Sequence, residues 1–297
     1  MQRNNHAVMI VLTLLLAGGT SACEAQSLND LWTQSTTSVY KMPTTQELRT
    51  AQDLFREHFK GRFDEKLVQQ WEKLGFQAQP IEQDKHHFFV IREHKEQRHG
   101  RGFFVFTPNR QAGITLQSPH RYHDRHTGDL ALKLLMSSDT VVAAAWNTTA
   151  RNTANKYFNN ADMAHLTQSH FTAFARAFSS IEKGSLIQIH GFSKQKRRTK
   201  QAAEADIIIS SATNMPGVRT QKISACLKHT TTFKVRIYPW DVQELGGTTN
   251  TVANALRATG SPAFVHMELN LDTRQKLLNN ATLLKQFSHC LPMGGSL

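Results

Sequence analysis

The sequence predicts an α/β fold in which a mostly parallel or mixed central sheet carries helices on both faces. After residue 108, short apolar runs alternate with amphipathic helical patterns, an order typical of sheets with parallel strands. One of these runs, residues 206–210, is apolar almost throughout, as expected of a strand buried on both faces. The chain has 297 residues, of which 39% are hydrophobic and 17 are Phe, so it can form a sizeable core and wholesale disorder is excluded.

The first part of the chain should be helical and then form a hairpin. Residues 26–43 are polar and are expected to be a loose lead-in. A helix is predicted from Thr44, with Thr45 as its cap, and a second one ends at Gly75. The strands that follow should cover 87–92 and 102–107 and be joined by a basic turn.

The second part alternates strands with helices. The predicted strands are 114–118, 140–146, 186–190, 206–210, 233–238 and 263–269. The predicted helices are 127–136, 161–181, 251–258 and 272–287. No internal repeat and no low-complexity tract interrupts this order.

Residues 1–25 are interpreted as a secretory signal. Arg3 supplies a positive start, residues 7–19 are an apolar run, and small residues follow up to Ala22. The protein is therefore expected to be exported, either periplasmic or secreted. Cys23 offers the alternative of a lipoprotein signal and a lipid anchor, but Thr20 stands where such signals usually carry Leu, so cleavage near Ala22 or Ala25 is favoured.

The chain is basic, with 35 Lys and Arg against 23 Asp and Glu and a net charge of +12. Removal of residues 1–25 takes away one Arg and one Glu and leaves this charge unchanged. No recognition-helix motif and no basic motif interleaved with aromatic residues occurs, so nucleic acid is not expected as a partner. No later apolar run reaches the length of about 20 residues that a membrane span requires, so no integral segment is expected in the mature chain.

Two cysteines, Cys226 and Cys290, would remain after cleavage. They could pair in an oxidising compartment, or they could be two buried free thiols. The sequence leaves both alternatives open.

Candidate metal ligands follow the strand predicted at 114–118. His120, His123, Asp124 and His126 lie within seven residues after Pro119. Imidazole and carboxylate groups suit Zn²⁺, and one short loop can supply two of the ligands. A solvated polar loop is the alternative, which the density of the cluster after a buried strand disfavours.

Two further strands end in residues of the same kind. His190 ends an apolar strand and is followed by Gly191, so it would supply a third ligand and leave a fourth position open. Alternation along the strand at 263–269 puts His266, Glu268 and Asn270 on one face. Glu268 is a candidate general base, with an ion pair to a helix arginine such as Arg274 as the alternative reading.

The order of these residues resembles the zinc-dependent exopeptidase and amidohydrolase group. This group includes metallocarboxypeptidases, N-acetylmuramoyl-L-alanine amidases and N-formylglutamate amidohydrolases. The resemblance spans residues 114–270 and implies a phosphorylase/hydrolase-like fold and hydrolysis of an amide bond by zinc-activated water. It implies that His120 and His190 are metal ligands and that Glu268 is catalytic.

Carboxypeptidases have a glutamate three residues after their first histidine, and that position is His123 here. Asp124 is favoured as the second ligand, because mixed histidine and carboxylate sites are typical of the group, and His123 is the alternative. On this interpretation residues 26–108 form an N-terminal helical and hairpin segment, and residues 109–297 form an α/β catalytic domain.

Further residues are candidates for substrate binding. Arg151 and Asn152 follow a strand and could hold a carboxylate, while Thr249 and Asn250 precede a predicted helix and could hold an anion. The expected substrate is a small peptide, an N-acyl amino acid or a cell-wall fragment. The rival hypothesis is a secreted metal- or anion-binding module with the same fold and no turnover.

Overall fold

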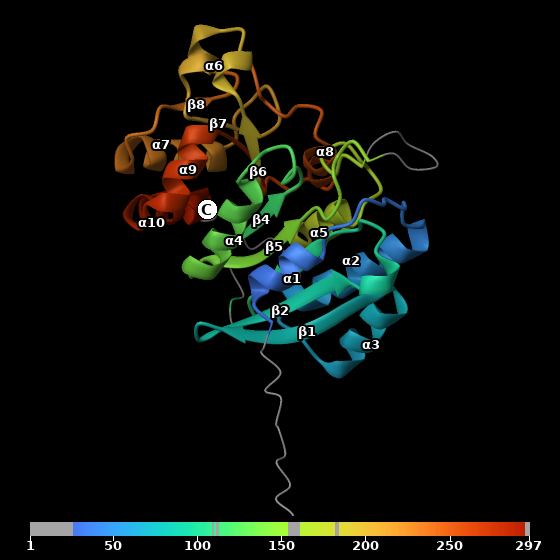
Figure 1. Ribbon diagram of the computed structural model, residues 1–297. Helices are drawn as coiled ribbons and strands as arrows, with labels where there is room; N and C mark the ends of the chain where they lie inside the picture. Colours follow the sequence, from blue (N-terminus) through green and yellow to red (C-terminus); the bar gives the residue numbers. More distant parts are fainter. Residues whose placement is uncertain (1–25, 109, 111–112, 154–160, 182–183, 295–297) are drawn as a thin grey trace, which may run out of the picture.

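The computed structural model describes residues 26–108, 110, 113–153, 161–181 and 184–294, in which strands form one mixed sheet in the order β1-β2-β3-β5-β4-β6-β9-β7-β8 (Figure 1). This confirms the predicted α/β class with a mixed central sheet. The strands are β1 Phe76–Gln83, β2 His86–Glu93, β3 Phe103–Phe106, β4 Gly113–Ser118, β5 Val141–Trp146, β6 Gly184–Phe192, β7 Ile207–Ser210, β8 Val235–Ile237 and β9 Phe264–Asn270.

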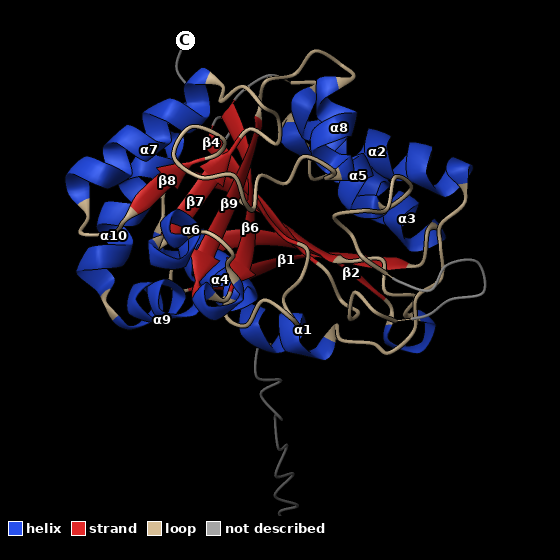
Figure 2. Cartoon of the chain, turned by 90° about the horizontal axis from the view of Figure 1, so that it is seen from above, coloured by secondary structure: helices blue, strands red, loops and turns tan. Residues whose placement is uncertain are grey.

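Helices cover both faces of the sheet, as Figure 2 shows from above. One face carries α2 (Thr45–Phe59), α3 (Glu65–Lys73), α5 (His170–Ser179) and α8 (Thr251–Arg257). The other carries α1 (Leu28–Gln34), α4 (Thr127–Ser137), α7 (Val218–Thr230), α9 (Leu271–Asn279) and α10 (Ala281–Cys290). The short α6 (Lys200–Glu204) and three single 3₁₀ turns (Lys95–Gln97, Lys194–Lys196 and Leu291–Gly294) complete the described elements.

The sheet combines an antiparallel edge with a parallel centre. The strand β2 pairs antiparallel with β1 on one side and with β3 on the other, and β3 pairs antiparallel with β5. The strands β5, β4, β6 and β9 then run parallel, and β7 is antiparallel to β9. The predicted hairpin is thus present, and its strands belong to the same sheet as the strands that follow.

The sequence expectation lacks the short α6 and three further elements of the described chain whose local signals are weak. The expected loose lead-in contains α1, which Ser27 and Asp30 cap reciprocally and which buries Leu28, Leu31 and Trp32. The strand β1 was missed because it contains Pro80, which an edge strand tolerates. The helix α7 has only a weakly amphipathic sequence and was missed as well.

Other boundaries also need correction. Thr44, not Thr45, caps α2. The helix expected over 161–181 is confined to α5, and the residues from Ala161 to Ser169 form turns and loops instead. The closing helix expected over 272–287 is two helices, because Asn280 leaves the helical conformation and caps α10.

The central strands become polar along one face toward their carboxyl ends. Alternate residues of β6 and β9, such as Ile187 and Val265, point into the apolar core beneath α4 and α9. On the opposite face Leu186 is apolar, but the next residues on that face, Gln188 and His190, are polar and buried. This change of polarity marks where a site can form.

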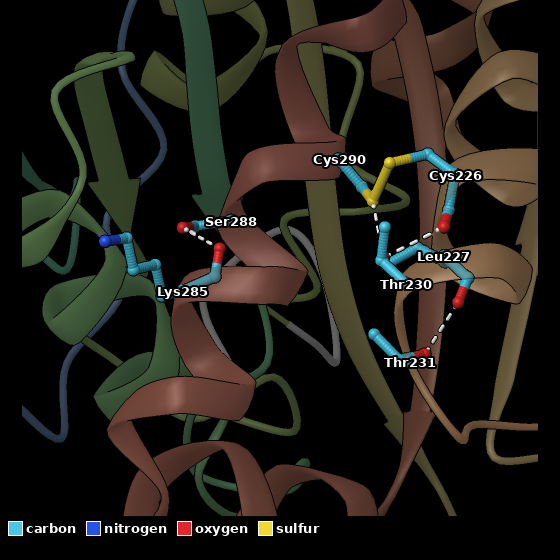
Figure 3. Close-up of a disulfide and its surroundings, with 7 residues drawn as sticks. All are labelled: Cys226, Leu227, Thr230, Thr231, Lys285, Ser288 and Cys290. Atoms are coloured by element: carbon cyan, nitrogen blue, oxygen red, sulfur yellow. Dashed lines mark hydrogen bonds between the residues drawn. A yellow bond between two sulfur atoms is a disulfide. The ribbon is translucent and has the colours of Figure 1, made fainter.

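Cys226 of α7 and Cys290 of α10 form a disulfide, which resolves the alternative left open by the sequence (Figure 3). Thr230 lies beside the bridge, with its Oγ1 3.2 Å from Cys290 Sγ. The bridge therefore links α10 covalently to α7.

Among the described residues, no helix is both long and apolar enough to cross a membrane. The predicted signal at residues 1–25, with Cys23, lies outside the described residues.

Replacing both Cys226 and Cys290 with Ser should destabilise the fold. The bridge closes a loop with a sequence separation of 64 residues, so its loss should lower the free energy of unfolding by about 4 kcal/mol. Urea unfolding of the double variant and of the wild type measures this difference. An unchanged midpoint would contradict the prediction, and Cys226→Ser alone should show the same loss.

His58 of α2 should make stability depend on acidity. Its Nδ1 donates to the Arg62 carbonyl at 2.7 Å, and its Nε2 accepts from Trp71 Nε1 at 2.9 Å, so the ring is held neutral. Burial lowers its pKa from 6.5 to about 4. Between these values the unfolded chain takes up a proton that the folded chain cannot, so stability should fall by about 3 kcal/mol as the pH drops from 6.5 to 4.

Urea unfolding at several pH values measures this effect. In His58→Gln the fall should be smaller by that amount. His87→Gln, at an exposed position, should keep the fall of the wild type. Equal pH profiles for His58→Gln and the wild type would contradict the assignment.

Candidate metal centre

A cleft of about 870 Å³ opens at the carboxyl ends of β4, β6 and β9. Its walls come from the loop after β4, the segment after β6, the start of α9 and the loop before α8. Ligands bind at this edge in α/β sheets, because the strand ends and the following loops meet there. All three predicted strand ends, with His120, His190 and Glu268, contribute to the cleft.

His120, Asp124 and His190 bring three potential ligand atoms together, all within 4.8 Å of one another. The Nδ1 atoms of His120 and His190 lie 3.4 and 3.6 Å from the same carboxylate oxygen, Asp124 Oδ2. A tight turn produces this arrangement, since the amides of His123 and Asp124 both donate to the His120 carbonyl. The turn places His120 and Asp124 on one side of the loop and leaves the His123 side chain exposed.

The outer nitrogen of His120 is held by a second carboxylate. Its Nε2 donates to Asp162 Oδ1 at 2.7 Å, and Asp162 also lies 3.2 Å from His165 Nδ1. Burial opposes the charge of His120, but the hydrogen bonds to Asp124 and Asp162 outweigh burial and raise its pKa to about 9. The same contacts hold the pKa of both aspartates below their usual range, against the effect of burial.

The Nε2 atom of His190 is hydrogen-bonded to the first of a row of side-chain amides. Its Nε2 lies 2.8 Å from Gln188 Oε1, Gln188 Nε2 donates to Gln117 Oε1 at 3.0 Å, and Gln117 Nε2 donates to the Phe171 carbonyl at 3.0 Å. A carbonyl can only accept, so the row has one direction and makes Gln188 Oε1 an acceptor. His190 therefore carries its proton on Nε2, and its Nδ1 lone pair faces Asp124.

Glu268 lies next to His190 on the neighbouring strand, to which it is paired in register. Its Oε2 is buried and has no hydrogen-bond partner among the described residues. Burial, with a smaller contribution from the charge of Asp124, raises the pKa of Glu268 to about 8. No ion pair within 4.0 Å joins Glu268 to Arg274 in the described chain, so the alternative reading of Glu268 as a structural ion-pair partner is not supported.

His266 is a further buried histidine beside these residues. It forms with His190 and Glu268 a second group that could hold a metal ion, and its Nε2 lies 3.9 Å from Glu268 Oε1. Its Nδ1 is buried and has no hydrogen-bond partner in the described part of the chain. Burial and the charge of neighbouring histidines hold its pKa well below 6.5.

The four residues predicted for substrate binding do not form one group, and three of them line the cleft. Arg151 and Thr249 line the cleft, with Thr249 Oγ1 3.3 Å from His165 Nε2. Asn152 is exposed and does not line the cleft. Asn250 lines it, but its side chain already donates to Gln188 Oε1 through Nδ2 and accepts from Ala253 N at Oδ1. Asn250 therefore supports the amide row.

Three supporting residues were missed from the sequence. Asp162 was assigned to a helix that does not form there, and it is 42 positions from His120, so no local pattern could have revealed the contact. Gln117 and Gln188 carried a signal, because each is a polar residue within an apolar strand. Gln188 also alternates with His190 and so shares its face.

The His120, Asp124 and His190 set fits a divalent metal ion. Donor atoms about 2.0–2.1 Å from a tetrahedral zinc lie about 3.3 Å apart, close to the 3.4 and 3.6 Å that separate Asp124 Oδ2 from the two histidine Nδ1 atoms. Metal-binding histidines usually donate their other N–H to a carboxylate or carbonyl, as Asp162 and Gln188 accept here. Within the described residues the second group has no such support, because no group accepts from or donates to the Nδ1 of His266 there.

No family model and no curated protein matches this chain. Solved structures similar to it include a Shewanella amazonensis protein provisionally named a metallopeptidase, with 13% identity, coverage of 76% of this chain and 94% of the other, and a TM-score of 0.36. An aspartoacylase family protein from Mesorhizobium loti has 11% identity, coverage of 73% and 67%, and a TM-score of 0.39. These descriptions fall within the group that the sequence motifs resemble, but such distant likenesses leave function to be argued from the site.

Replacing Gln188 with Leu should weaken metal binding. Without an acceptor at Nε2, His190 is free to change its tautomer and orientation, so the affinity for Zn²⁺ should fall by about 10- to 100-fold. Competition with a chromophoric chelator measures the affinity. Gln275→Leu is the control, because Gln275 is exposed at the cleft wall and should leave it unchanged. Equal affinities for the two variants would refute the support role.

Proposed function

We propose that this chain is an exported zinc-dependent hydrolase that cleaves an amide or peptide bond. The observation that carries the proposal is the convergence of His120 Nδ1, His190 Nδ1 and Asp124 Oδ2 beside the buried Glu268, whose Oε2 has no hydrogen-bond partner among the described residues. Three protein ligands leave a fourth position for water or substrate, which is the arrangement of catalytic rather than structural zinc. The substrate is a small peptide, an N-acyl amino acid or a cell-wall fragment.

Each residue has a defined part in this proposal. His120, Asp124 and His190 hold the metal, which when bound polarises an amide carbonyl and lowers the pKa of a water molecule. Glu268 accepts the proton of the attacking water at Oε2 and delivers it to the departing amine nitrogen. Its Oε2 has no hydrogen-bond partner among the described residues, so this atom is free to accept a proton, and a bound cation would favour the ionised carboxylate that accepts it.

A metal- or anion-binding module without turnover is the second candidate. It is favoured by the position three residues after His120, where carboxypeptidases have a glutamate and this chain has the exposed His123. The two candidates share the metal site and differ in whether Glu268 performs chemistry.

Substituting Glu268 with Gln should separate the two candidates. Gln has the same shape but cannot take a proton from water, so kcat on an amide substrate should fall by about 10²- to 10⁴-fold while zinc remains stoichiometric. Steady-state hydrolysis of a panel of N-acyl amino acids and dipeptides, with metal analysis of the same samples, measures both quantities. The exposed Glu96→Gln should behave as the wild type.

Hydrolysis by the wild type that survives in Glu268→Gln would refute the role of Glu268. Stoichiometric zinc without hydrolysis of any amide by the wild type would favour the binding module. Absence of bound zinc in the wild type and unchanged metal content in His120→Ala would refute the metal site.

A further inference from the structure

Arg274 is a cationic side chain in the cleft wall for which the proposed chemistry has no use. It lies in the first turn of α9, directly after β9, and only 4% of its surface is exposed. Its guanidinium occupies the space beside Gly191, where an added Cβ would lie 1.6 Å from Nη1. The absence of a side chain at Gly191 therefore leaves room for the Arg274 guanidinium next to His190.

The guanidinium has no partner within the described chain. Its Nε and Nη1 atoms are sealed from solvent without a hydrogen bond, and no carboxylate oxygen lies within 4.0 Å of it. Arg274 lines the cleft, and Nη2 is the guanidinium nitrogen that is not among its fully buried, unpartnered atoms, so Nη2 is the one left for a ligand. A buried guanidinium without a partner is unfavourable, so this position is suited to an anion that enters the cleft.

The surrounding wall adds positive charge. Lys194, Lys196 and Arg197 come from the segment after β6, and Arg125 comes from the loop after β4. Two of these cations are already engaged, with Lys194 2.8 Å from Asp206 and Arg197 3.5 Å from Glu244.

Few acidic side chains line this wall of the cleft. Beyond the residues of the proposed catalytic centre, Asp272 is the one acidic side chain among the described residues that line the cleft, and it lies 2.8 Å from Lys276. The cleft therefore attracts anions toward Arg274.

We propose that Arg274 is a substrate subsite that binds a carboxylate through Nη2, so that the preferred substrates are acidic amides. This inference rests on the proposed function, which places the scissile bond beside Glu268. A planar, singly charged carboxylate matches the single guanidinium, whose N–H groups donate charge-assisted hydrogen bonds. Asp124 and Glu268 do not satisfy Arg274, and they are committed to the metal and to proton transfer.

Binding of glutarate and of its neutral analogue glutaramide tests the subsite directly. Calorimetry on the zinc-loaded protein should give an affinity for glutarate that falls by about tenfold or more in Arg274→Gln, because charge-assisted hydrogen bonds are lost. The affinity for glutaramide should not change. Lys196→Gln removes an exposed cation of the same wall and should lower glutarate affinity by less than about threefold, since exposed charges are screened.

Gly191→Ala provides an independent variant should Arg274→Gln not fold. Its Cβ would occupy the place of Nη1 and displace the guanidinium while the positive charge is retained. It should lose the preference for glutarate over glutaramide and keep stoichiometric zinc. Unchanged glutarate affinity in Arg274→Gln, or in zinc-loaded Gly191→Ala, would overturn the subsite, as would an equal loss in Lys196→Gln.

Hydrolysis then shows on which side of the bond the carboxylate lies. Glutaryl p-nitroanilide, compared with its carboxamide analogue, places a carboxylate on the acyl side, and N-acetyl-alanine, compared with N-acetyl-alaninamide, places one on the amine side. Arg274→Gln should lower kcat/KM for the acidic member of one pair only. If the wild type cleaves neither pair or any other amide, the proposed function fails, whereas the glutarate measurement still decides the subsite.

Discussion

The parallel register of β6 between β4 and β9 is the constraint on which the candidate metal centre depends. It aligns Gln117 with Gln188 and Gln188 with His266, and one step further along the same face it aligns His190 with Glu268. A slip of β6 by one residue would turn its apolar side chains toward the cleft and its polar ones into the core. The apolar packing on the opposite face therefore fixes the site as well as the sheet.

The two candidate histidine ligands are oriented by different means. His120 is held between carboxylates, which favour its charged form, whereas His190 is held by a row of neutral amides in a fully buried position and has a lowered pKa. The row ends at the Phe171 carbonyl, so every amide in it has a fixed direction. Burying so many polar groups costs free energy unless all are hydrogen-bonded, and this closed row meets that requirement.

The sequence could predict what depends on local patterns. Strand and helix periodicity indicated the α/β class, and the position of His120, Asp124, His190 and Glu268 at strand ends indicated one edge of the sheet. Contacts between distant segments have no such signal, and Asp162 is the clearest example, because the sequence pattern of its loop predicts a helix.

Elements that depend on their surroundings were also missed. The strand β1 contains proline and many polar residues, and it is a strand because it pairs along its full length with β2 at the edge of the sheet. The pairing of Cys226 with Cys290 requires α7 and α10 to lie side by side, which the order of elements along the chain does not specify.

The charges of the buried groups bear on how the proposed site could take up a metal ion. Without metal, Asp124 and Asp162 are ionised at neutral pH, while the raised pKa values of His120 and Glu268 keep both of these groups protonated. A metal ligand must be deprotonated, so His120 releases a proton when a cation binds, and the cation favours ionisation of Glu268 as well. A divalent cation that replaces two protons leaves the net charge of the buried cluster unchanged.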